Sequence, residues 1–405
     1  MPIATSGSVS ISVDEAIIGN TAPGAMTITG PETWTRSFLL TIGNESVGTL
    51  TLDGAGVFAA VNGSGVTNLG YEGGSGTLII TNGAHFTNFI TFVGVGGGSG
   101  VLELSGAGSV MTLQRLDRDS GSASVTVDGG TFRLLNATAD IFTKIGTVTL
   151  EAGGGVFETD NTDRFTATSF VGAGGLTKQG AGTLTLSGAS TYAGATTIKA
   201  GAINVRSAGA LGDAAGTTTV QAGAALEVQG GTTLAEAISL NGTGVSDGGA
   251  LRNVSGDNTL TGTVTLGSDA SIVSAAGKLT LSGALLGAGD DLTFGGAGDI
   301  AVTGVLSSGG GLEKRGAGTL TLSGANAYTG NTVIHEGAVT LAHAIALGPA
   351  GATEVKDGGA LQLTGGVTVL QNLTVRGTGV ADGGALRNVS GDNILSGTVT
   401  LEANT

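Results

Sequence analysis

The sequence has no cysteine and contains little proline, aromatic or charged residue. Its 405 residues include 4 Pro, 1 Trp and 3 Tyr, and 12% of them are charged. Without Cys the core has to be stable without disulfides, and an oxidising compartment is tolerated. The scarcity of Pro, together with many Thr and Val, favours β-strands joined by turns.

Basic charge and long apolar runs are also scarce. The formal net charge is −15, from 31 acidic and 16 basic residues, so the chain repels phosphate backbones and anionic membrane surfaces. Nucleic acid is therefore not expected as a partner. Every apolar stretch ends well short of the roughly 18 residues that a membrane helix needs. Residues 1–7 lack the basic and apolar segments of a signal peptide, and we expect the chain to be a fragment if it is exported.

Glycine is the abundant residue, with 78 copies in the chain. Collagen is excluded because no strict third-position Gly runs through the sequence. Intrinsic disorder fits poorly, since 40% of the residues are hydrophobic and few are charged. Gly in such numbers is typical of turns, where φ is often positive or two backbones come close.

A long internal repeat organises the second half of the chain. Residues 174–201 and 310–337 agree at 19 of 28 positions without a gap. Residues 241–258 and 376–393 agree at 16 of 18 and share the run GGALRNVSGDN. A unit of about 135 residues has thus been duplicated, and such self-similarity is the signature of repeat architectures.

Short strands with alternating apolar and polar residues recur inside and before that unit. They share an inward Leu, Val or Ile, an outward Thr and a bracketing Gly, as in 48–52, 76–80, 100–104, 124–127, 184–186, 279–281 and 320–322. An antiparallel sandwich or barrel would join such strands by two-residue Asn-Gly hairpins. A parallel β-helix would instead stack like residues once per rung, about every 20–25 residues. Leu78 and Leu102 are separated by one such interval, which favours the β-helix.

The predicted fold is therefore all-β, a right-handed parallel β-helix (solenoid) of roughly 18 rungs. Its expected parts are an N-terminal entry or cap segment at 1–40, loose 24–28-residue repeats at 41–173, the first copy of the unit at 174–309 and a truncated second copy at 310–405. The last rung should expose an unpaired parallel edge, which predicts self-association.

Residues 174–205 and 310–341 resemble the passenger-associated transport repeat of Gram-negative autotransporters, and residues 34–112 are similar to looser repeats of the same passengers. The motif has a Lys, a GAGTLTLSG core and a Tyr-x-Gly. We interpret its residues as structural: Lys178, Leu184, Leu186, Tyr192 and Gly194 in the first copy, and Lys314, Leu320, Leu322, Tyr328 and Gly330 in the second.

The resemblance implies a β-helical passenger carried to the cell surface by a C-terminal outer-membrane barrel, with repeats that help the passenger to fold during export. We expect no part of this sequence to form that barrel. We expect a non-enzymatic, surface-displayed or secreted stalk or adhesin scaffold without a cofactor. Its expected partners are a host-surface or matrix ligand, or further copies of itself.

Three catalytic or metal-binding alternatives have weaker support. Asp119-Ser120-Gly121-Ser122 is similar to the nucleophile loop of serine protease autotransporters, but Arg118 and Ala123 replace the usual Gly and Pro, and a polar turn is the preferred interpretation. Residues 287–291 and 295–299 resemble a calcium-binding nonapeptide, although Ile300 stands where a liganding Asp is needed. The histidines, His85, His335 and His343, show no zinc-site spacing.

A glycan-binding or glycan-cleaving β-helix is the remaining alternative. Such proteins use clustered acids and aromatic platforms, whereas this chain has a single Trp, Trp34, and no recurring acidic cluster. Asn253-Val254-Ser255 and Asn388-Val389-Ser390 fit the glycosylation sequon, but stacked turns supported by Asn are the simpler interpretation.

Overall fold

The computed structural model describes residues 15–31, 33–36, 39–61, 65–135 and 140–402. The predicted fold class is confirmed: the protein is all-β, with about 2% helix and parallel strands stacked as a β-solenoid of about 16 turns. The count is below the expected 18 because several turns are long. The interval between the register partners Leu50 and Leu78, for example, is longer than the interval between Leu78 and Leu102. The chain divides into two compact units, residues 1–197 with 209–216 and residues 198–208 with 217–405.

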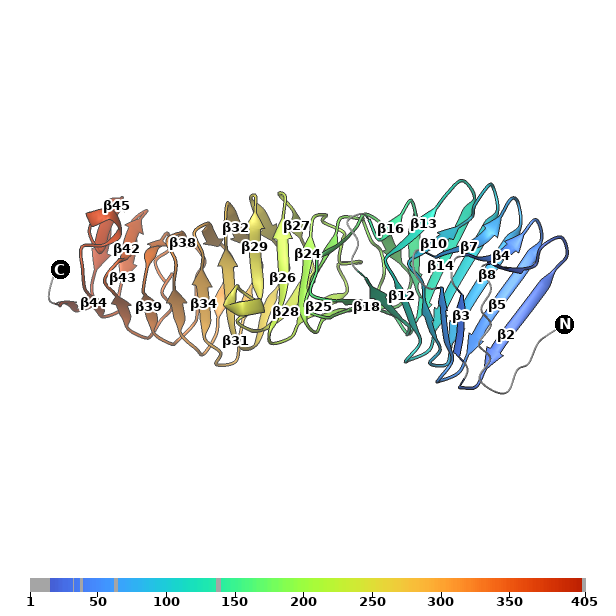
Figure 1. Cartoon of the computed structure of the whole chain (residues 1–405). Coiled ribbons are helices and arrows are strands. Elements are labelled where there is room, and N and C mark those ends of the chain that lie inside the picture. The colour runs from blue at the N-terminus through green and yellow to red at the C-terminus, as the bar shows by residue number, and fades with distance from the viewer. Residues whose placement is uncertain (1–14, 32, 37–38, 62–64, 136–139, 403–405) are drawn as a thin grey trace. The chain divides into compact units, whose positions relative to one another are not determined.

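The first unit has three columns of parallel strands (Figure 1). One column contains β1 (Glu15–Ile18), β4 (Leu39–Asn44), β7 (Val66–Tyr71), β10 (Ile90–Val93), β13 (Arg115–Arg118) and β16 (Phe142–Thr143). A second contains β2 (Gly24–Thr29), β5 (Val47–Asp53), β8 (Ser75–Thr81), β11 (Ser99–Ser105), β14 (Ser122–Asp128), β17 (Thr147–Leu150) and β20 (Ser169–Val171). The third column contains β3 (Thr33–Arg36), β6 (Phe58–Val61), β9 (His85–Thr87), β12 (Val110–Leu113), β15 (Thr131–Leu134), β18 (Gly155–Thr159), β21 (Leu176–Gln179) and β23 (Thr196–Ile198). β19 (Arg164–Thr166) pairs with β22 (Thr183–Leu186).

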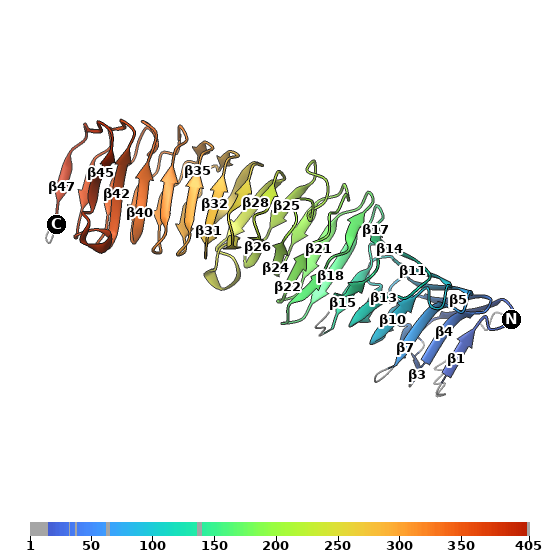
Figure 2. The same cartoon turned by 90° about the horizontal axis from the view of Figure 1, so that it is seen from above.

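Like residues stack on like in this unit, as the sequence spacing predicts. Leu50, Leu78 and Leu102 are successive register partners in β5, β8 and β11, and all three side chains are fully buried. Because side chains alternate between the two faces of a strand, the residues on either side of each leucine, such as Thr49 and Thr51 in β5, face outward. These strand pairs are parallel, which rules out the antiparallel alternative for these strands. Figure 2 shows the stacked strands from above.

Aromatic side chains fill the interior near the end of the first unit. Phe132 and Phe157 are register partners, and their ring centroids lie 5.8 Å apart. Phe142 and Phe170 pack against this pair, each making an edge-on contact with Phe157. These buried rings supply a large apolar area, in geometries that aromatic pairs prefer.

The strands of the second unit form three columns, which we call ladders 1, 2 and 3. Ladder 1 contains β25 (Thr217–Val220), β28 (Ala237–Gly242), the start of β31 (Val264–Ser274), β33 (Leu285–Leu286) and β36 (Leu306–Ser307). Ladder 2 contains β24 (Gly201–Val205), β26 (Ala224–Gln229), β29 (Leu251–Ser255), the end of β31, β34 (Leu292–Gly295), β37 (Leu312–Lys314), β39 (Thr332–Ile334), β41 (Thr353–Val355), β44 (Leu373–Val375) and β47 (Val399–Leu401). Ladder 3 contains β27 (Thr233–Leu234), β30 (Asn258–Leu260), β32 (Lys278–Leu281), β35 (Asp299–Val302), β38 (Thr319–Leu322), β40 (Gly337–Leu341), β42 (Gly359–Thr364) and β45 (Leu386–Ser390).

Four short elements complete the second unit. β43 (Thr368–Val369) pairs with β46 (Ile394–Leu395), and two 3₁₀ turns, η1 (Val245–Asp247) and η2 (Val380–Asp382), precede β29 and β45. No helix in the described ranges has the length and apolarity of a membrane-spanning segment.

The duplicated unit does not occupy a whole number of turns. β28 and β29 of the first copy lie on ladders 1 and 2, whereas their equivalents β44 and β45 lie on ladders 2 and 3. The second copy is therefore displaced by one ladder around the solenoid. Equivalent outward-facing residues of the two copies consequently lie on different faces of the solenoid.

Candidate functional site: the buried lysine and tyrosine of the repeat

Lys314 ends β37 and points into the interior, with 2% of its surface exposed. Its Nζ donates hydrogen bonds to the carbonyl oxygens of Arg315 (2.9 Å), Gly316 and Glu336 (3.2 Å). The first two acceptors belong to the turn that follows β37, and Glu336 belongs to the equivalent turn one rung further on. The ammonium group therefore ties two successive turns together.

Burial of the charged Lys314 ammonium group carries a desolvation cost. Burial lowers the pKa of its ammonium group from 10.5 to about 8, and the carboxylates of Glu336 and Asp299 act in the opposite direction. At neutral pH the side chain is still mainly protonated. A buried charge is tolerable only when hydrogen bonds satisfy it, and the three carbonyl oxygens provide that compensation.

Gly337 is required next to this lysine. Its φ is +69°, in the left-handed region, and a Cβ at this position would lie 2.8 Å from the Lys314 Nζ and 2.4 Å from the Gly316 carbonyl oxygen. Any other residue would push on the backbone and on the ammonium group together. The buried lysine is thus one reason why this position, at the end of the motif, requires glycine.

Tyr328 is the second buried polar residue of the motif, with 1% of its surface exposed. Its hydroxyl group and the Thr332 hydroxyl share a hydrogen bond of 2.7 Å. Burial raises the pKa of the Tyr328 hydroxyl far above 10, so the group stays protonated over the whole useful pH range. Gly348, at φ +72°, packs against the Tyr328 carbonyl oxygen, which a Cβ would approach to 2.2 Å.

Gly330, two residues after Tyr328, allows close contact between rungs. A Cβ there would lie 2.3 Å from the Gly310 carbonyl carbon and 2.4 Å from the Gly311 nitrogen. The Gly330 amide instead donates to the Gly310 carbonyl oxygen at 3.1 Å. Leu320 and Leu322 are fully buried on β38, where they form the apolar layer between the lysine and the tyrosine turns.

The first copy repeats the same contacts. Lys178 is fully buried and donates to the carbonyl oxygens of Gln179 (2.8 Å) and Gly180 (2.7 Å), and burial lowers its pKa to about 8. The Tyr192 hydroxyl and the Thr196 hydroxyl lie 2.5 Å apart.

The apolar residues and the glycine of the first copy also take equivalent positions. Leu184 and Leu186 are buried, and Gly194 would bring a Cβ to 2.4 Å from the Gly175 nitrogen. All ten residues predicted for the motif therefore lie in the packed interior or at contacts between turns.

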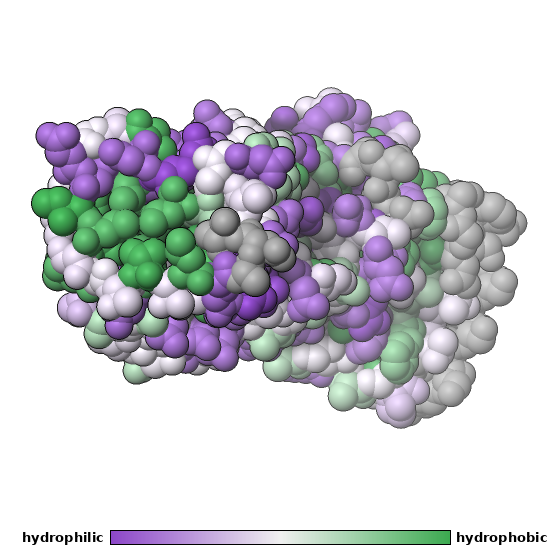
Figure 3. Space-filling model, turned by 90° about the vertical axis from the view of Figure 1, so that its left-hand side faces the viewer, coloured by the Kyte–Doolittle hydropathy of each residue, from purple (hydrophilic) through white to green (hydrophobic). Residues whose placement is uncertain are grey.

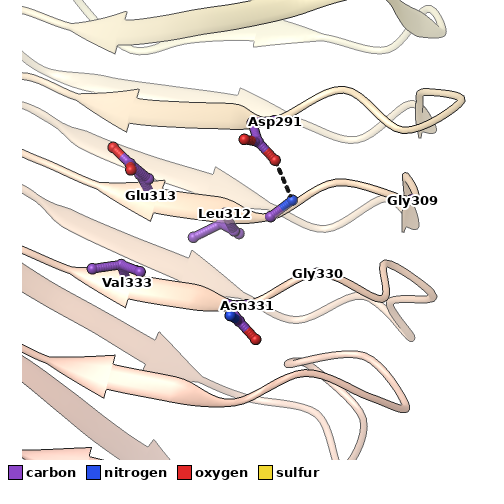
Figure 4. A pocket seen from close by; sticks show the side chains of 8 residues that line it. Asp291, Gly309, Leu312, Glu313, Gly330, Asn331 and Val333 are labelled. Carbon is purple, nitrogen blue, oxygen red and sulfur yellow. Dashed lines mark hydrogen bonds between the residues drawn. The ribbon is translucent and has the colours of Figure 1, made fainter.

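A shallow pocket of about 330 Å³ opens on the outer face of β37 and β39. Figure 4 shows Asp291, Glu313 and Asn331 around it, with Gly309 and Gly330 in the turns that border it. The Asp291 carboxylate accepts a hydrogen bond from the Gly311 amide at 2.6 Å, and the Asn331 side chain accepts one from the Ala352 amide at 3.0 Å. These polar groups are used to hold the next rung.

The calcium alternative rested on carboxylates that accept backbone hydrogen bonds in the structure. Asp290 accepts a hydrogen bond from the Ala288 amide at 3.3 Å, and Asp291 stabilises the corner described above. Within the described residues, no three His, Cys, Asp or Glu side chains come together as a metal-binding group.

The other sequence candidates lie in turns or on strand faces. Ser120 donates to the Asp119 carboxylate at 3.0 Å between β13 and β14, as expected for a polar turn. His85, in β9, packs on Phe58 with ring centroids 4.9 Å apart, and burial lowers the pKa of its imidazole. His335 lies 3.7 Å from the Glu313 carboxylate, and His343 accepts a hydrogen bond from the Ile345 amide.

Within the described ranges three buried charged residues, Asp117, Arg164 and Glu236, were not singled out from the sequence. Arg164 is 2% exposed and donates to the Asp160 carboxylate at 2.6 Å and to the Leu134 carbonyl oxygen at 3.3 Å. Glu236 is 5% exposed and accepts a hydrogen bond from the Thr218 hydroxyl at 2.9 Å. Alignment of the two copies could have drawn attention to Glu236, because Gln371 takes its place in the second copy.

Comparisons with known proteins agree with this geometry. Residues 176–205 and 312–341 match the Passenger-associated-transport-repeat family, so the buried lysines and tyrosines are residues of that repeat. The chain is similar to an autotransporter passenger. It is 33% identical over 177 residues to the adhesin BmaC autotransporter of Brucella suis biovar 1 (strain 1330). That match covers 38% of this chain and 5% of the relative, so the chain spans a small part of the relative's length. No solved structure matches.

The resemblance to an autotransporter passenger with transport repeats is thereby confirmed: the chain is a passenger-like β-helix with two such repeats.

Proposed function

We propose that this chain is a non-enzymatic stalk or adhesin scaffold, displayed on the surface of a Gram-negative bacterium. In the full-length protein a C-terminal outer-membrane barrel anchors it, and release from the cell gives a secreted form. The adhesin named among its relatives supports the adhesive role, and the repeats support the link to export.

The uninterrupted stacking of rungs within each unit is the observation that carries the proposal. Every strand of ladders 2 and 3 between β29 and β44 has a parallel neighbour on both sides. Such a repeat structure is stiff because each rung packs on its neighbours throughout its length. Stiffness suits a protein that spaces a binding surface away from the cell.

The buried lysine supports a role in export. Lys314 reaches from the turn of its own rung to the Glu336 carbonyl oxygen in the next turn, so each rung presents bonding groups on which its neighbour is completed. Folding outside the cell, one rung after another, makes backsliding unfavourable. The lysine of the repeat then stabilises the contact between successive rungs.

The expected partner is a host-surface or matrix ligand, or a second copy of the chain. The net charge of −15 disfavours nucleic acid. An immobilised-ligand binding assay with purified chain tests this, using separate host matrix proteins, the chain itself and serum albumin as the control surface. We expect saturable binding to a matrix protein or to the chain. Binding no stronger than to albumin on every surface would contradict the adhesive role.

The export role has its own test. The chain is expressed behind a signal peptide and ahead of an autotransporter barrel, as wild type and as the Lys178→Ala, Lys314→Ala double variant. We expect surface display of the double variant to fall several-fold, while Lys199→Ala, Lys278→Ala leaves display unchanged because both of these lysines are exposed. Full display of the buried-lysine variant would overturn the role of the repeats in export.

A further inference from the structure

The pocket on the outer face of β37 and β39 arises because a glycine stands between two polar residues. Asp291, Gly311 and Asn331 hold equivalent register positions on three successive rungs, directly before β34, β37 and β39. Asp291 and Asn331 (Figure 4) are therefore two rungs apart, about 9.6 Å, and Gly311 leaves the space between them open. The hollow of about 330 Å³ lies between a carboxylate and a carboxamide, and its volume is that of a small-molecule site.

The polar side chains around the hollow keep free bonding capacity. The Asp291 Oδ1 accepts a hydrogen bond from the Gly311 amide at 2.6 Å, and the Asn331 Oδ1 accepts one from a backbone amide of the next rung at 3.0 Å. Among the described residues, neither the Asp291 Oδ2 nor the Asn331 Nδ2 has a partner. The Glu313 Oε1 has none among them either, because Arg315 donates to its Oε2, at 2.9 Å. The hollow thus offers two acceptors and one donor group.

The charges at the hollow favour an uncharged ligand. The Arg315 guanidinium and, at 3.7 Å, the His335 imidazole lie beside the Glu313 carboxylate, so a cation would compete with them. An anion would be repelled by Asp291 and Glu313. Val333 adds a half-buried apolar surface to the lining. A neutral compound with several hydroxyl groups and an apolar C–H face matches this combination, since each hydroxyl group both donates and accepts.

The first copy of the repeat lacks these polar groups. Residues 174–201 and 310–337 differ at 9 of 28 positions, and five of the nine line the hollow or contact Glu313. They are Glu313, Arg315, Asn331, Val333 and His335, in place of Thr177, Gln179, Ala195, Thr197 and Lys199. Gly154, before β18, stands where Asp291 does. Because the first copy forms the same rung without these side chains, the solenoid does not require them.

We propose that this hollow binds a neutral sugar unit of a host glycan. Two sugar hydroxyl groups donate to Asp291 and Glu313, an oxygen of the sugar accepts from Asn331, and the C–H face packs on Val333. Figure 3, which views the molecule from the end that carries β45, shows hydrophilic residues bordering the apolar ones on two sides. A sugar on an outer face therefore meets polar surroundings. The inference rests on the adhesive role proposed above, for which it names the class of ligand.

The test uses the full chain and saturation-transfer difference NMR with the methyl glycosides of glucose, galactose, mannose, fucose, N-acetylglucosamine and N-acetylgalactosamine. We expect saturable binding of at least one of them. The anionic methyl glucuronide and the cationic glucosamine are the controls, and both should bind at least 10-fold more weakly. Absence of saturable binding by every neutral glycoside, or equal binding of a charged control, would overturn the proposal.

Variants of the chain place the sugar in the hollow. Glu313→Thr, Asn331→Ala introduces the residues of the first copy, with which the rung is known to form, and should weaken binding at least 10-fold. Ala327→Thr also introduces a first-copy residue, but at an exposed position outside the hollow, and should leave binding unchanged. Sugar binding that the double variant does not alter would overturn the proposed location.

The double variant also separates this inference from the adhesive role. In the immobilised-ligand assay we expect its binding to a matrix protein to fall several-fold. Equal binding of wild type and double variant to that protein would overturn the inference and leave the adhesive role standing. Absence of binding on every surface contradicts the adhesive role, whereas the NMR measurement tests the hollow by itself.

Discussion

The two copies of the duplicated loop and strand share a sequence but differ in their surroundings. In the first copy, residues 251–255 lie on ladder 2 under a following rung, and Leu251 and Asn253 are fully buried. In the second copy, residues 386–390 lie on ladder 3, and four of the five are exposed. Conformation is nevertheless the same: Ser246 and Ala381 both have φ +50°.

The comparison separates the properties that depend on a segment's own sequence from those that depend on the neighbouring rung. The turn is fixed by its own Gly, Thr and Asp residues, since it forms with and without a covering rung. Burial, hydrogen-bond satisfaction and hence stability come from the next rung, as expected of a fold whose energy is a sum of nearest-neighbour terms. The predictions below test this separation, from the largest expected effect to the smallest.

The largest effect is expected where a glycine lies between two rungs. Gly330→Ala would place a Cβ 2.3 Å from the Gly310 carbonyl carbon, and no rotamer change can relieve a clash with backbone. We expect a loss of about 4 kcal/mol in the free energy of unfolding. Urea unfolding followed by circular dichroism measures it. Gly289→Ala is the control, because nothing lies within 4 Å of its Cβ and its stability should be unchanged; equal effects would contradict the packing.

The second prediction compares the same asparagine in its two environments. Asn253→Ala leaves the Ser274 hydroxyl and the Ala276 carbonyl oxygen without their buried partner, so we expect a loss of about 3 kcal/mol. Asn388→Ala removes only exposed bonds, one to the Gly391 carbonyl oxygen and one from the Asn393 side-chain amide, and the loss should stay below about 0.5 kcal/mol. Amide hydrogen exchange at each site measures local stability. Similar losses at both sites would show that the covering rung is not the cause.

The third prediction concerns pH. Burial raises the pKa of the Glu236 carboxyl group from 4.5 to about 7, while the Thr218 hydroxyl group opposes the shift. Between these values the folded chain holds a proton that the unfolded chain has lost, so stability falls as pH rises from about 4.5 to about 7 and stays low above it. Glu236→Gln should therefore stabilise the chain by roughly 2 kcal/mol at pH 8 and have little effect at pH 4.

The second copy supplies the reciprocal change for this test. Gln371 stands where Glu236 does, and its amide donates to the Gly348 carbonyl oxygen. Gln371→Glu should lower stability in the same direction as pH rises, but by less, because residue 371 is only half-buried. Thermal unfolding over a pH series measures both variants, and a flat difference between Glu236→Gln and wild type across the series would contradict the burial of this carboxyl group.

The smallest effect is expected in the turns. Ser246 and Ala381 occupy the left-handed region, which costs a residue with a side chain about 1 kcal/mol. Replacing either one by Gly should stabilise its turn by about 0.5 kcal/mol, and by the same amount in both copies because the conformation is local. Hydrogen exchange at 248–250 and 383–385 measures the gain. A gain in one copy alone would show that the covering rung shapes the turn.

The stacking of the fold was predictable because it follows from spacing. Leu78 and Leu102, which the sequence separates by one repeat interval, are register partners in the structure, and the Leu-Thr-Leu strands alternate as expected. The displacement of the second copy by one ladder was not predictable, since it depends on the varying lengths of individual turns. The interval from Leu226 to its partner Leu251, for example, is longer than the interval from Leu251 to its next partner, Ile272.

The candidate site was predictable in its residues but not in its geometry. The repeat alignment identifies Lys314 and Tyr328, yet a lysine after an alternating strand is ordinarily expected at the surface. Its burial depends on three carbonyl oxygens that only the folded turns bring together. Arg164 gave no such signal, because it lies outside the duplicated unit and its partners come from separate turns.

In-register parallel stacking is the central claim, and the absence of natural Cys allows a direct test. Thr293 and Glu313 are register partners on β34 and β37, and Val333 is one rung further on. Neighbouring parallel strands lie about 4.8 Å apart, within disulfide range, whereas two rungs span about 9.6 Å, which is beyond it. Mild oxidation should therefore cross-link the Thr293→Cys, Glu313→Cys variant and leave Thr293→Cys, Val333→Cys reduced. Cross-linking of the second variant but not the first would contradict the stacking.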